Sequence, residues 1–382
     1  MNIIFFRWNV VNENRIAEAL KLLGHRVFDC SDNLNDYSFD ASAMQKLLMQ
    51  IHKCKADMLF SVDYIPLLAL VADTAHINYY SWVQDAPNFT MYSDTMKLAV
   101  NHCYMFDREE AGAMRQMGND RVLYYPLASD PVFFNNVIRL CEGKESDKYA
   151  DEVSFVGSVY GHGKNEAAYE SLSDYDRGYC ESLMNAQQLI YGGNIIEECM
   201  DSDLADRIVA AAGVSFSGEY NFDSRRVACY YLEKQLTGKE RYDFLTAVAA
   251  HFSLSVYSGD KSVDIPKAQI KGFADYETVM PLIFYRSKIN LHFAPRFIHD
   301  GVSLRVMDVL ACGGFLVTSY HKGIEGLFND EHLVTFSSEE ELLDKIDFYL
   351  KNEDARVKIS AAGRRIVEEK YTYAKALETI LA

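Results

Sequence analysis

The stretch NLHFAPRFIHDGVSLRVMDVLACGGFLVTS, residues 290–319, is the most regularly organised part of the chain. It starts at the end of an apolar segment, Lys288–Phe293, which predicts a strand. A polar loop follows, and Val302–Ala311 then predicts an apolar helix that stops at Gly313-Gly314. The apolar segment Phe315–Thr318 predicts the next strand. This order indicates a parallel β-α-β unit, with the polar loop at the carboxyl end of its first strand.

The same alternation extends outward from this unit in both directions. Toward the C-terminus, Leu333–Phe336 predicts a strand, and Glu339–Lys351 and Asp354–Lys370 predict helices. The first 130 residues repeat the rhythm, with predicted strands at Asn2–Phe6, Arg26–Cys30, Ala56–Val62, Ile77–Trp82, Cys103–Phe106 and Val122–Tyr125. We therefore expect an α/β protein with two Rossmann-like domains, whose carboxyl sheet edges face a common cleft.

A chain of 382 residues has room for two or three domains. We place the N-terminal domain at 1–135, a polar and charged linker at 136–151, and the second domain at 152–370. Residues from about 165 to 250 lack strand signals and predict a helical insertion in the second domain. Residues 371–382 predict a C-terminal helix that returns to the first domain.

Composition excludes several classes of function. Thirty-eight basic against 55 acidic residues give a net charge of −17, which opposes binding to nucleic acid or anionic lipid. No apolar run approaches the ~18–20 residues of a membrane span, and the first residues resemble a strand rather than a signal peptide. The eight cysteines include no C-x-x-C pair, which is typical of a reducing compartment. A cytoplasmic protein without a membrane span is expected.

The loop and helix after residue 299 combine features of an anion site. The backbone N–H groups of Val302, Ser303 and Leu304 lie at the predicted helix start, where free donors and the helix dipole favour a diphosphate. Asp300 precedes the helix and Asp308 lies eight residues further on, so both can reach along one bound ligand. The alternative is that Asp300 is an ordinary N-cap and Asp308 a solvated side chain. The apolar neighbours of Asp308 favour a function.

These residues carry a family resemblance. The segment resembles the nucleotide-sugar motif of group 1 GT-B glycosyltransferases, with Asp at both positions where Glu is usual. GVSLRVMDVLACGGFLVTSY resembles more closely the CgeB-like (spore maturation) glycosyltransferases. INYYSWVQDAP, NHCYMFDREEAGAM and YYPLASDP resemble the N-terminal domain of that group. The resemblance covers most of residues 55–160 and 270–375.

The resemblance implies a GT-B glycosyltransferase that moves a sugar from a nucleotide diphosphate sugar to a hydroxyl acceptor on a glycan, protein or small molecule. A UDP-sugar is the expected donor, and the paired acids resemble those of retaining enzymes. Asp308 is expected to bind the ribose hydroxyls and Asp300 the transferred sugar. Further expected donor-binding groups are Val302, Ser303, Leu304, Arg305, Gly157, Ser158 and Lys164.

The first domain is expected to bind the acceptor. Trp82 and Asp85 follow a predicted strand, so Trp82 is a candidate to stack on a sugar ring and Asp85 to bind or deprotonate a hydroxyl. Asp85 and Asp300 are thus the catalytic candidates, and a true base at Asp85 would imply inversion. Arg7, Trp8 and Asn9 follow the first strand and are weaker candidates. The alternatives are core packing for Trp82 and a turn aspartate for Asp85.

Two other functions remain open. An epimerase or phosphorylase would use the same diphosphate site, and a nucleotide-sugar-binding or spore-surface assembly protein would need no catalysis. Neither a metal ion nor a cofactor is expected, because the histidines are scattered and no Asp-x-Asp lies between apolar strand residues. Gly161–Lys164 lacks the spacing of a P-loop.

Overall fold

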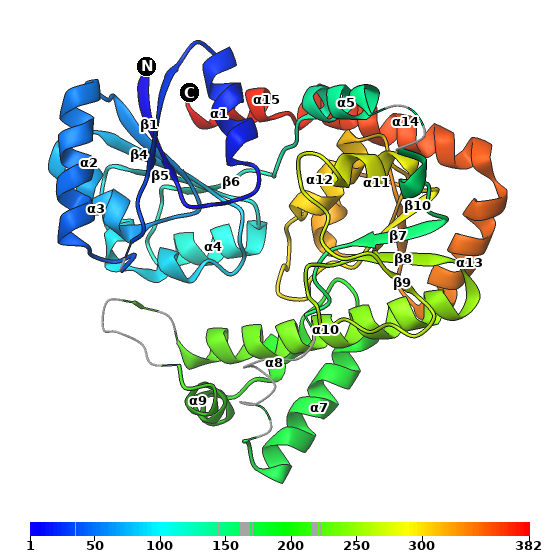
Figure 1. Cartoon of the computed structure of the whole chain (residues 1–382). Helices are drawn as coiled ribbons and strands as arrows, with labels where there is room; N and C mark the ends of the chain where they lie inside the picture. Colours follow the sequence, from blue (N-terminus) through cyan, green and yellow to red (C-terminus); the bar gives the residue numbers. More distant parts are fainter. Residues whose placement is uncertain are drawn as a thin grey trace. The chain divides into compact units, whose positions relative to one another are not determined.

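The computed structural model describes residues 1–34, 36–141, 143, 146–160, 169, 171–214, 220–221 and 223–382 (Figure 1). The chain divides into two compact units. Unit 1 comprises Met1–Ala128, Phe216–Phe222 and Tyr371–Ala382, and unit 2 comprises Ser129–Ser215 and Asp223–Lys370. No helix of the described residues combines the length and hydropathy needed to cross a bilayer. All eight cysteines are free thiols.

Unit 1 is built on a parallel sheet. Its described strands are ordered β2-β1-β3-β4-β5-β6 and span β1 (Asn2–Arg7), β2 (Arg26–Ser31), β3 (Met58–Val62), β4 (Asn78–Val83), β5 (Asn101–Met105) and β6 (Val122–Tyr124). The connections contain α1 (Glu13–Leu22), α2 (Ala41–Cys54), α3 (Pro66–Ala75), the 3-10 turns η1 (Phe89–Tyr92) and η2 (Asp94–Lys97), and α4 (Arg108–Gln116). Every residue of β3 is buried, as expected for a strand covered on both faces.

The last helix of the chain belongs to unit 1. α15 (Tyr373–Ile380) packs against α1 and buries Tyr373, Leu377 and Ile380. The Asn12 side-chain amide donates to the Tyr373 hydroxyl over 3.1 Å, which joins two positions at opposite ends of the chain. Unit 1 is therefore completed only when the C-terminal residues are in place.

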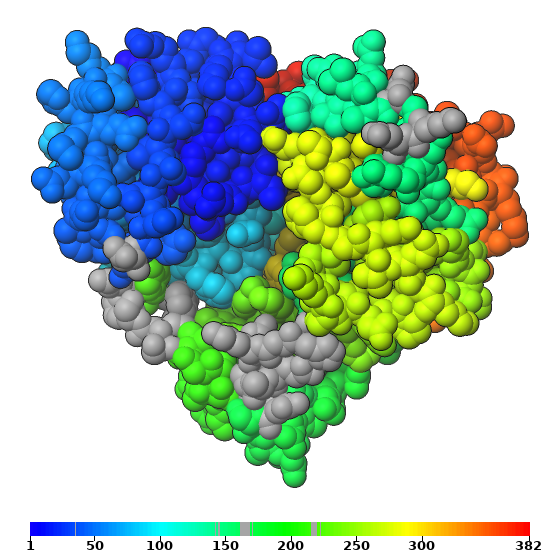
Figure 2. Space-filling model, in the orientation of Figure 1, coloured from blue at the N-terminus to red at the C-terminus, as the bar shows by residue number. Residues whose placement is uncertain are grey.

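Unit 2 has a second parallel sheet. Its described strands are ordered β12-β11-β10-β7-β8-β9 and span β7 (Val153–Val156), β8 (Leu254–Tyr257), β9 (Gln269–Ile270), β10 (Ile289–His292), β11 (Leu316–Ser319) and β12 (Val334–Phe336). The helices around it are α5 (Pro131–Leu140), α11 (Met280–Arg286), α12 (Leu304–Ala311), α13 (Glu339–Lys351) and α14 (Glu353–Lys370). Residues between β8 and α11 form a continuous part of its surface (yellow-green to yellow in Figure 2). Two parallel sheets with helical connections confirm the predicted α/β class.

Four helices lie between β7 and β8 in the described residues. They are α7 (Asp174–Gln188), α8 (Ile195–Cys199), α9 (Ser202–Ala211) and α10 (Ser224–His251). The first three contact α10 below the sheet of unit 2 in Figure 1. The last turns of α10 bury Phe244, Leu245 and Val248 in the same core as β7, β8 and β10. That end of α10 is thus a crossover helix of the Rossmann-like core, although the sequence assigned all of 165–250 to an insertion.

The segment predicted as a linker at 136–151 is partly helical and belongs to unit 2. α5 continues to Leu140, and the 3-10 turn η3 spans Ser146–Tyr149. Arg286 of α11 donates to the Ser146 hydroxyl and to the Asp147 carboxylate, each over 2.7 Å. One face of α5 buries Phe134 and Ile138, and this apolar face begins before the first residue of the predicted linker.

Candidate functional site

A topological switch point lies between β7 and β10 in unit 2, because the chain leaves β7 to one side first and later returns to the other. In open α/β sheets, ligands bind at the carboxyl ends of the strands at such a point. The buried guanidinium of Arg241, from α10, donates to the Ser158 carbonyl and to the Phe293 carbonyl, each over 2.7 Å. These carbonyls follow β7 and β10, so Arg241 holds the two loops of the switch point together. Arg241 was not among the site residues predicted from the sequence.

Arg241 and Arg305 place positive charge at this edge. Arg241 lies 4.7 Å from the centre of the Tyr160 ring, and Arg305 lies 5.4 Å from that of Phe284. Burial lowers the pKa of Arg241, and the charge of Arg305 acts in the same direction. Within the described residues, neither guanidinium forms an ion pair with a carboxylate. Arg241 is buried and Arg305 is half-buried, and a buried guanidinium without a carboxylate partner favours an anionic ligand.

Asp308 is enclosed in unit 2, with 1% of its surface exposed. Its Oδ1 accepts hydrogen bonds from the Ser129 hydroxyl over 2.8 Å and the Tyr276 hydroxyl over 3.1 Å. Its buried Oδ2 has no hydrogen-bond partner among the described residues. Burial raises the pKa of Asp308 to about 6, against the opposing charge of Arg305 and the two hydroxyl donors. The alternative of a solvated helix residue is wrong.

The loop before α12 is held by polar contacts. α12 begins at Leu304, two residues later than predicted, and Ser303 is its N-cap residue. The Ser303 hydroxyl is 2.8 Å from Nε2 of His292, whose Nδ1 is 2.9 Å from the Thr318 hydroxyl. The Asp300 carboxylate is buried and lies 3.6 Å from Nζ of Lys322. Asp300 is therefore not the N-cap, which was the alternative to a binding role.

Two of the three predicted phosphate-binding residues after β7, Gly157 and Ser158, lie within the described residues. Gly157 donates its backbone N–H to the Tyr257 carbonyl over 3.0 Å. A Cβ at Gly157 would make an ordinary 3.4 Å contact with the Phe155 ring, so packing does not require glycine there. Ser158 is exposed, and its carbonyl accepts from Arg241. Lys164 lies outside the described residues.

The corresponding edge of unit 1 has its own switch point, between β1 and β3. The Trp8 indole N–H donates to the Val62 carbonyl over 2.8 Å, which joins the ends of these strands. Arg7 forms an ion pair with Asp29 at 2.6 Å. Asn9 is exposed and has a φ of 76°. Trp8 and Arg7 thus stabilise the edge at which an acceptor was predicted to bind.

Trp82 is a core residue, which corrects the prediction that it stacks on an acceptor. Its exposed fraction is 0%, and the rings of Tyr125 and Tyr373 pack edge-on against it at 6.2 and 6.0 Å. The predicted position of Trp82 on a strand was correct. However, α15 covers this face of β4, and the sequence near residue 82 does not indicate that a helix from the end of the chain packs there.

Asp63 is a second buried carboxyl group that sequence reasoning missed. Its Oδ1 accepts the backbone N–H groups of Gln84 over 2.7 Å and Asp85 over 3.1 Å. Burial raises the pKa of Asp63 to about 8, and the neighbouring Asp85 adds to the effect. Asp85 itself is exposed in the loop after β4. Asp63 therefore fixes the backbone that presents Asp85, whose acceptor role stays a prediction.

Residues 239–382 match a protein family described as "Glycosyl transferase-like". The matched segment includes Arg241, Asp300, Arg305 and Asp308. No curated protein sequence matches the chain significantly.

Solved structures that resemble the whole chain include the following three. A glycosyltransferase from Rickettsia africae ESF-5 has a TM-score of 0.52 and 14% identity, and the match covers 100% of this chain and 96% of that one. Anabaena HepE in complex with UDP and glucose has a TM-score of 0.56 and 9% identity, and the match covers 100% of this chain and 98% of that one. Sucrose-phosphate synthase from Thermosynechococcus elongatus has a TM-score of 0.55 and 9% identity, and the match covers 99% of this chain and 97% of that one. The chain has the GT-B fold.

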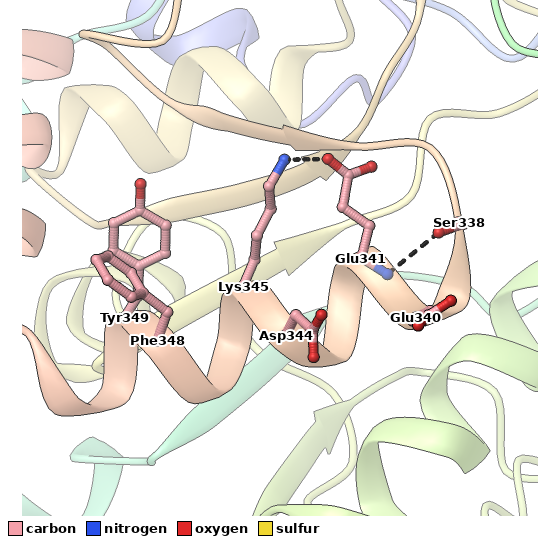
Figure 3. A pocket seen from close by; sticks show the side chains of 7 residues that line it. All are labelled: Ser338, Glu340, Glu341, Asp344, Lys345, Phe348 and Tyr349. Carbon is pink, nitrogen blue, oxygen red and sulfur yellow. Dashed lines mark hydrogen bonds and ion pairs between the residues drawn. The ribbon is translucent and has the colours of Figure 1, made fainter.

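A pocket lies along α13 and is lined by Ser338, Glu340, Glu341, Asp344, Lys345, Phe348 and Tyr349 (Figure 3). Lys345 pairs with Glu341, and the Ser338 hydroxyl accepts the Glu341 backbone N–H over 3.1 Å. Three carboxylates around one paired lysine repel a diphosphate. The cations and the unpaired oxygen of Asp308 make the edge of β7 and β10 the better candidate.

Proposed function

We propose that this protein is a glycosyltransferase that moves a sugar from a nucleotide diphosphate sugar to a hydroxyl acceptor. The proposal rests chiefly on Asp308, a buried carboxyl group whose Oδ2 has no partner among the described residues, on the helix that follows the Asp300 loop. Such an oxygen is costly unless a donor satisfies it, and a pair of ribose hydroxyls provides suitable donors. The family match over residues 239–382 supports the same function.

The charged groups of the unit 2 edge have roles in this proposal. Arg241 and Arg305 would bind the diphosphate, together with the backbone N–H groups at the start of α12. Their charges would stabilise the nucleoside diphosphate as it departs, which is the main electrostatic demand of the reaction. Asp300 would accept hydrogen bonds from the transferred sugar, and Lys322 would hold its carboxylate in place.

The finer assignments belong to the same proposal. We propose a UDP-sugar as donor, which the structural likeness to HepE with UDP and glucose supports. We also propose retention of configuration and independence of a metal ion. The paired aspartates support the first, and two arginines that can balance the diphosphate charge support the second. The CgeB-like resemblance of residues 301–320 suggests the subgroup. The eight free thiols support a reducing location such as the cytoplasm.

Calorimetric titration with UDP, GDP and TDP tests the donor site, and incubation with UDP-glucose and an acceptor panel tests turnover. We expect UDP to bind with the highest affinity and to be released when an acceptor is present. NMR of the product distinguishes retention from inversion. A changed sugar without acceptor would indicate an epimerase, and tight binding without turnover a binding protein. Absence of binding to all three nucleotides would refute the proposal.

A further inference from the structure

His321 is a buried histidine whose ring makes no hydrogen bond among the described residues. It lies two residues after β11, at the carboxyl edge of the unit 2 sheet, and 8% of its surface is exposed. Both Nδ1 and Nε2 are buried without a partner. A neutral imidazole has one N–H donor and one acceptor nitrogen, and burying both unpaired is costly. A ligand that supplies the missing partners would remove this cost.

The segment 321–323 packs directly on the loop before α12. A Cβ added to Gly323 would collide with the Gly301 carbonyl oxygen, so the two backbones are in close contact. Lys322 reaches Asp300, with Nζ 3.6 Å from Oδ2. His292 contacts Ser303, the N-cap residue of α12. His321 lies close to His292, since a positive charge on His321 lowers the pKa of His292. The segment that carries His321 therefore packs on the loop that bears Asp300, the predicted sugar-binding carboxylate.

The chemistry of the ring selects the kind of ligand. Burial lowers the pKa of His321 to about 4, so the imidazole is neutral at physiological pH. Among the described residues, His292 is the titratable group that interacts electrostatically with His321, and the Lys322–Asp300 ion pair begins at the next residue of the chain. A sugar hydroxyl both donates and accepts, which matches a neutral imidazole, whereas a phosphate oxygen would satisfy only its N–H.

We propose that His321 binds a hydroxyl group of the donor's sugar and helps to select that sugar. This proposal rests on the proposed glycosyltransferase function and adds a specificity-determining residue to it. His321 would act beside Asp300, and the nucleotide would be bound by Asp308, Arg241 and Arg305. Loss of the ring should then weaken binding of a nucleotide sugar while leaving binding of the nucleotide unchanged.

The test compares the affinities of UDP and UDP-glucose for the wild type, His321→Ala and His321→Gln, each measured by calorimetry. In the wild type, the glucose moiety should strengthen binding. In His321→Ala, the UDP-glucose affinity should fall about three- to tenfold, the range for one or two hydrogen bonds, with UDP unchanged within about twofold. His321→Gln keeps a donor and an acceptor and should recover part of the loss.

His251→Ala is the matched control, because His251 is exposed at the end of α10, before β8. Melting temperatures of all variants show whether each is folded at the titration temperature. Equal ratios of UDP-glucose to UDP affinity in the wild type and both His321 variants overturn the proposal. Parallel loss of UDP and UDP-glucose binding also overturns it, because the role would then be structural. If the wild type binds neither ligand, the glycosyltransferase proposal itself fails.

Discussion

At the scale of single residues, Asp308 and Asp63 are carboxyl groups that the fold encloses almost completely. Asp308 accepts hydrogen bonds from two hydroxyls, and Asp63 accepts them from two backbone N–H groups and from the Asn88 side chain. Hydrogen bonds to a carboxylate lower its pKa, and burial raises it. Burial is the larger effect at both sites, so both pKa values are raised.

Asp308→Asn should change how stability depends on pH. The folded pKa of Asp308, about 6, lies above its ordinary value of 3.8. Protonation of Asp308 therefore stabilises the folded state fully below about pH 4, and this stabilisation is lost as the pH rises through about 6. A shift of about two units corresponds to at most about 3 kcal/mol. Asparagine does not titrate, so urea unfolding of the mutant should lack this loss between pH 4 and 7.

The same substitution should weaken UDP binding by about 1–3 kcal/mol at pH 7, because asparagine lacks a charged acceptor for the ribose. UDP affinity of the wild type should also fall as the pH drops below 6. Calorimetry at pH 5 and 7.5 on both proteins checks this. Equal affinities, combined with a large loss of stability, would make Asp308 a purely structural residue.

Asp63→Ala should loosen the loop after β4, since the N–H groups of Gln84 and Asp85 would lose their common acceptor. We expect a loss of about 1–3 kcal/mol in local stability, seen as faster hydrogen exchange of these two amides. Asp63→Asn keeps the acceptor oxygen and serves as the control, with exchange close to that of the wild type. Unchanged exchange in the alanine variant would remove Asp63 from this role.

At the scale of elements, the unit 2 edge is assembled by contacts between loops and a crossover helix. α10 brings Arg241 to the loops after β7 and β10. The turn η4 (Lys322–Ile324) packs on Gly301, just before α12. The position of each binding loop thus depends on an element that is distant in sequence.

Gly323→Ala should displace the 300–303 loop, because the new methyl group would collide with backbone atoms of Gly301, which cannot rotate away. We expect a loss of about 1–3 kcal/mol in stability and weaker UDP-glucose binding. Gly178→Ala is the control, since Gly178 lies in α7 with no atom within 4 Å of an added Cβ. It should stabilise the protein by up to about 1 kcal/mol. Equal melting temperatures for wild type and Gly323→Ala would contradict the close contact.

At the scale of the whole molecule, neither unit is a single continuous stretch of chain. Unit 1 takes its first residues from the N-terminus and its last helix from the C-terminus. The helix α15 encloses Trp82 through Tyr373, so the core of unit 1 includes both ends of the sequence.

A chain ending at Lys370 should therefore lose stability in unit 1. The deletion removes the buried side chains of Tyr373, Leu377 and Ile380, which together contribute about 5 kcal/mol or more of burial free energy. Trp82 should become accessible to a fluorescence quencher. Deletion of Leu381–Ala382 alone should leave both properties nearly unchanged. A truncated chain with normal unfolding and a protected Trp82 would show that α15 is dispensable.

The alternating pattern of the sequence by itself determined the two parallel α/β sheets, because apolar strands and helices repeat at short intervals wherever both faces of a sheet are covered. It also determined that Asp308 is unusual, since a carboxyl group among apolar helix residues needs compensation. The strand assignments likewise predicted that polar candidates such as Asp85 and Asp300 lie in loops that follow the carboxyl ends of strands.

The tertiary structure alone decided which of those residues are available. Trp82 is enclosed by a helix almost 300 residues away, and Ser129 reaches Asp308 across 179 positions. Arg241, Asp63 and His321 have no local signature and are distinguished only by burial and by their partners or lack of them. Local sequence patterns report the faces of single elements, whereas desolvation and hydrogen bonding at a site depend on contacts made after distant elements have packed together.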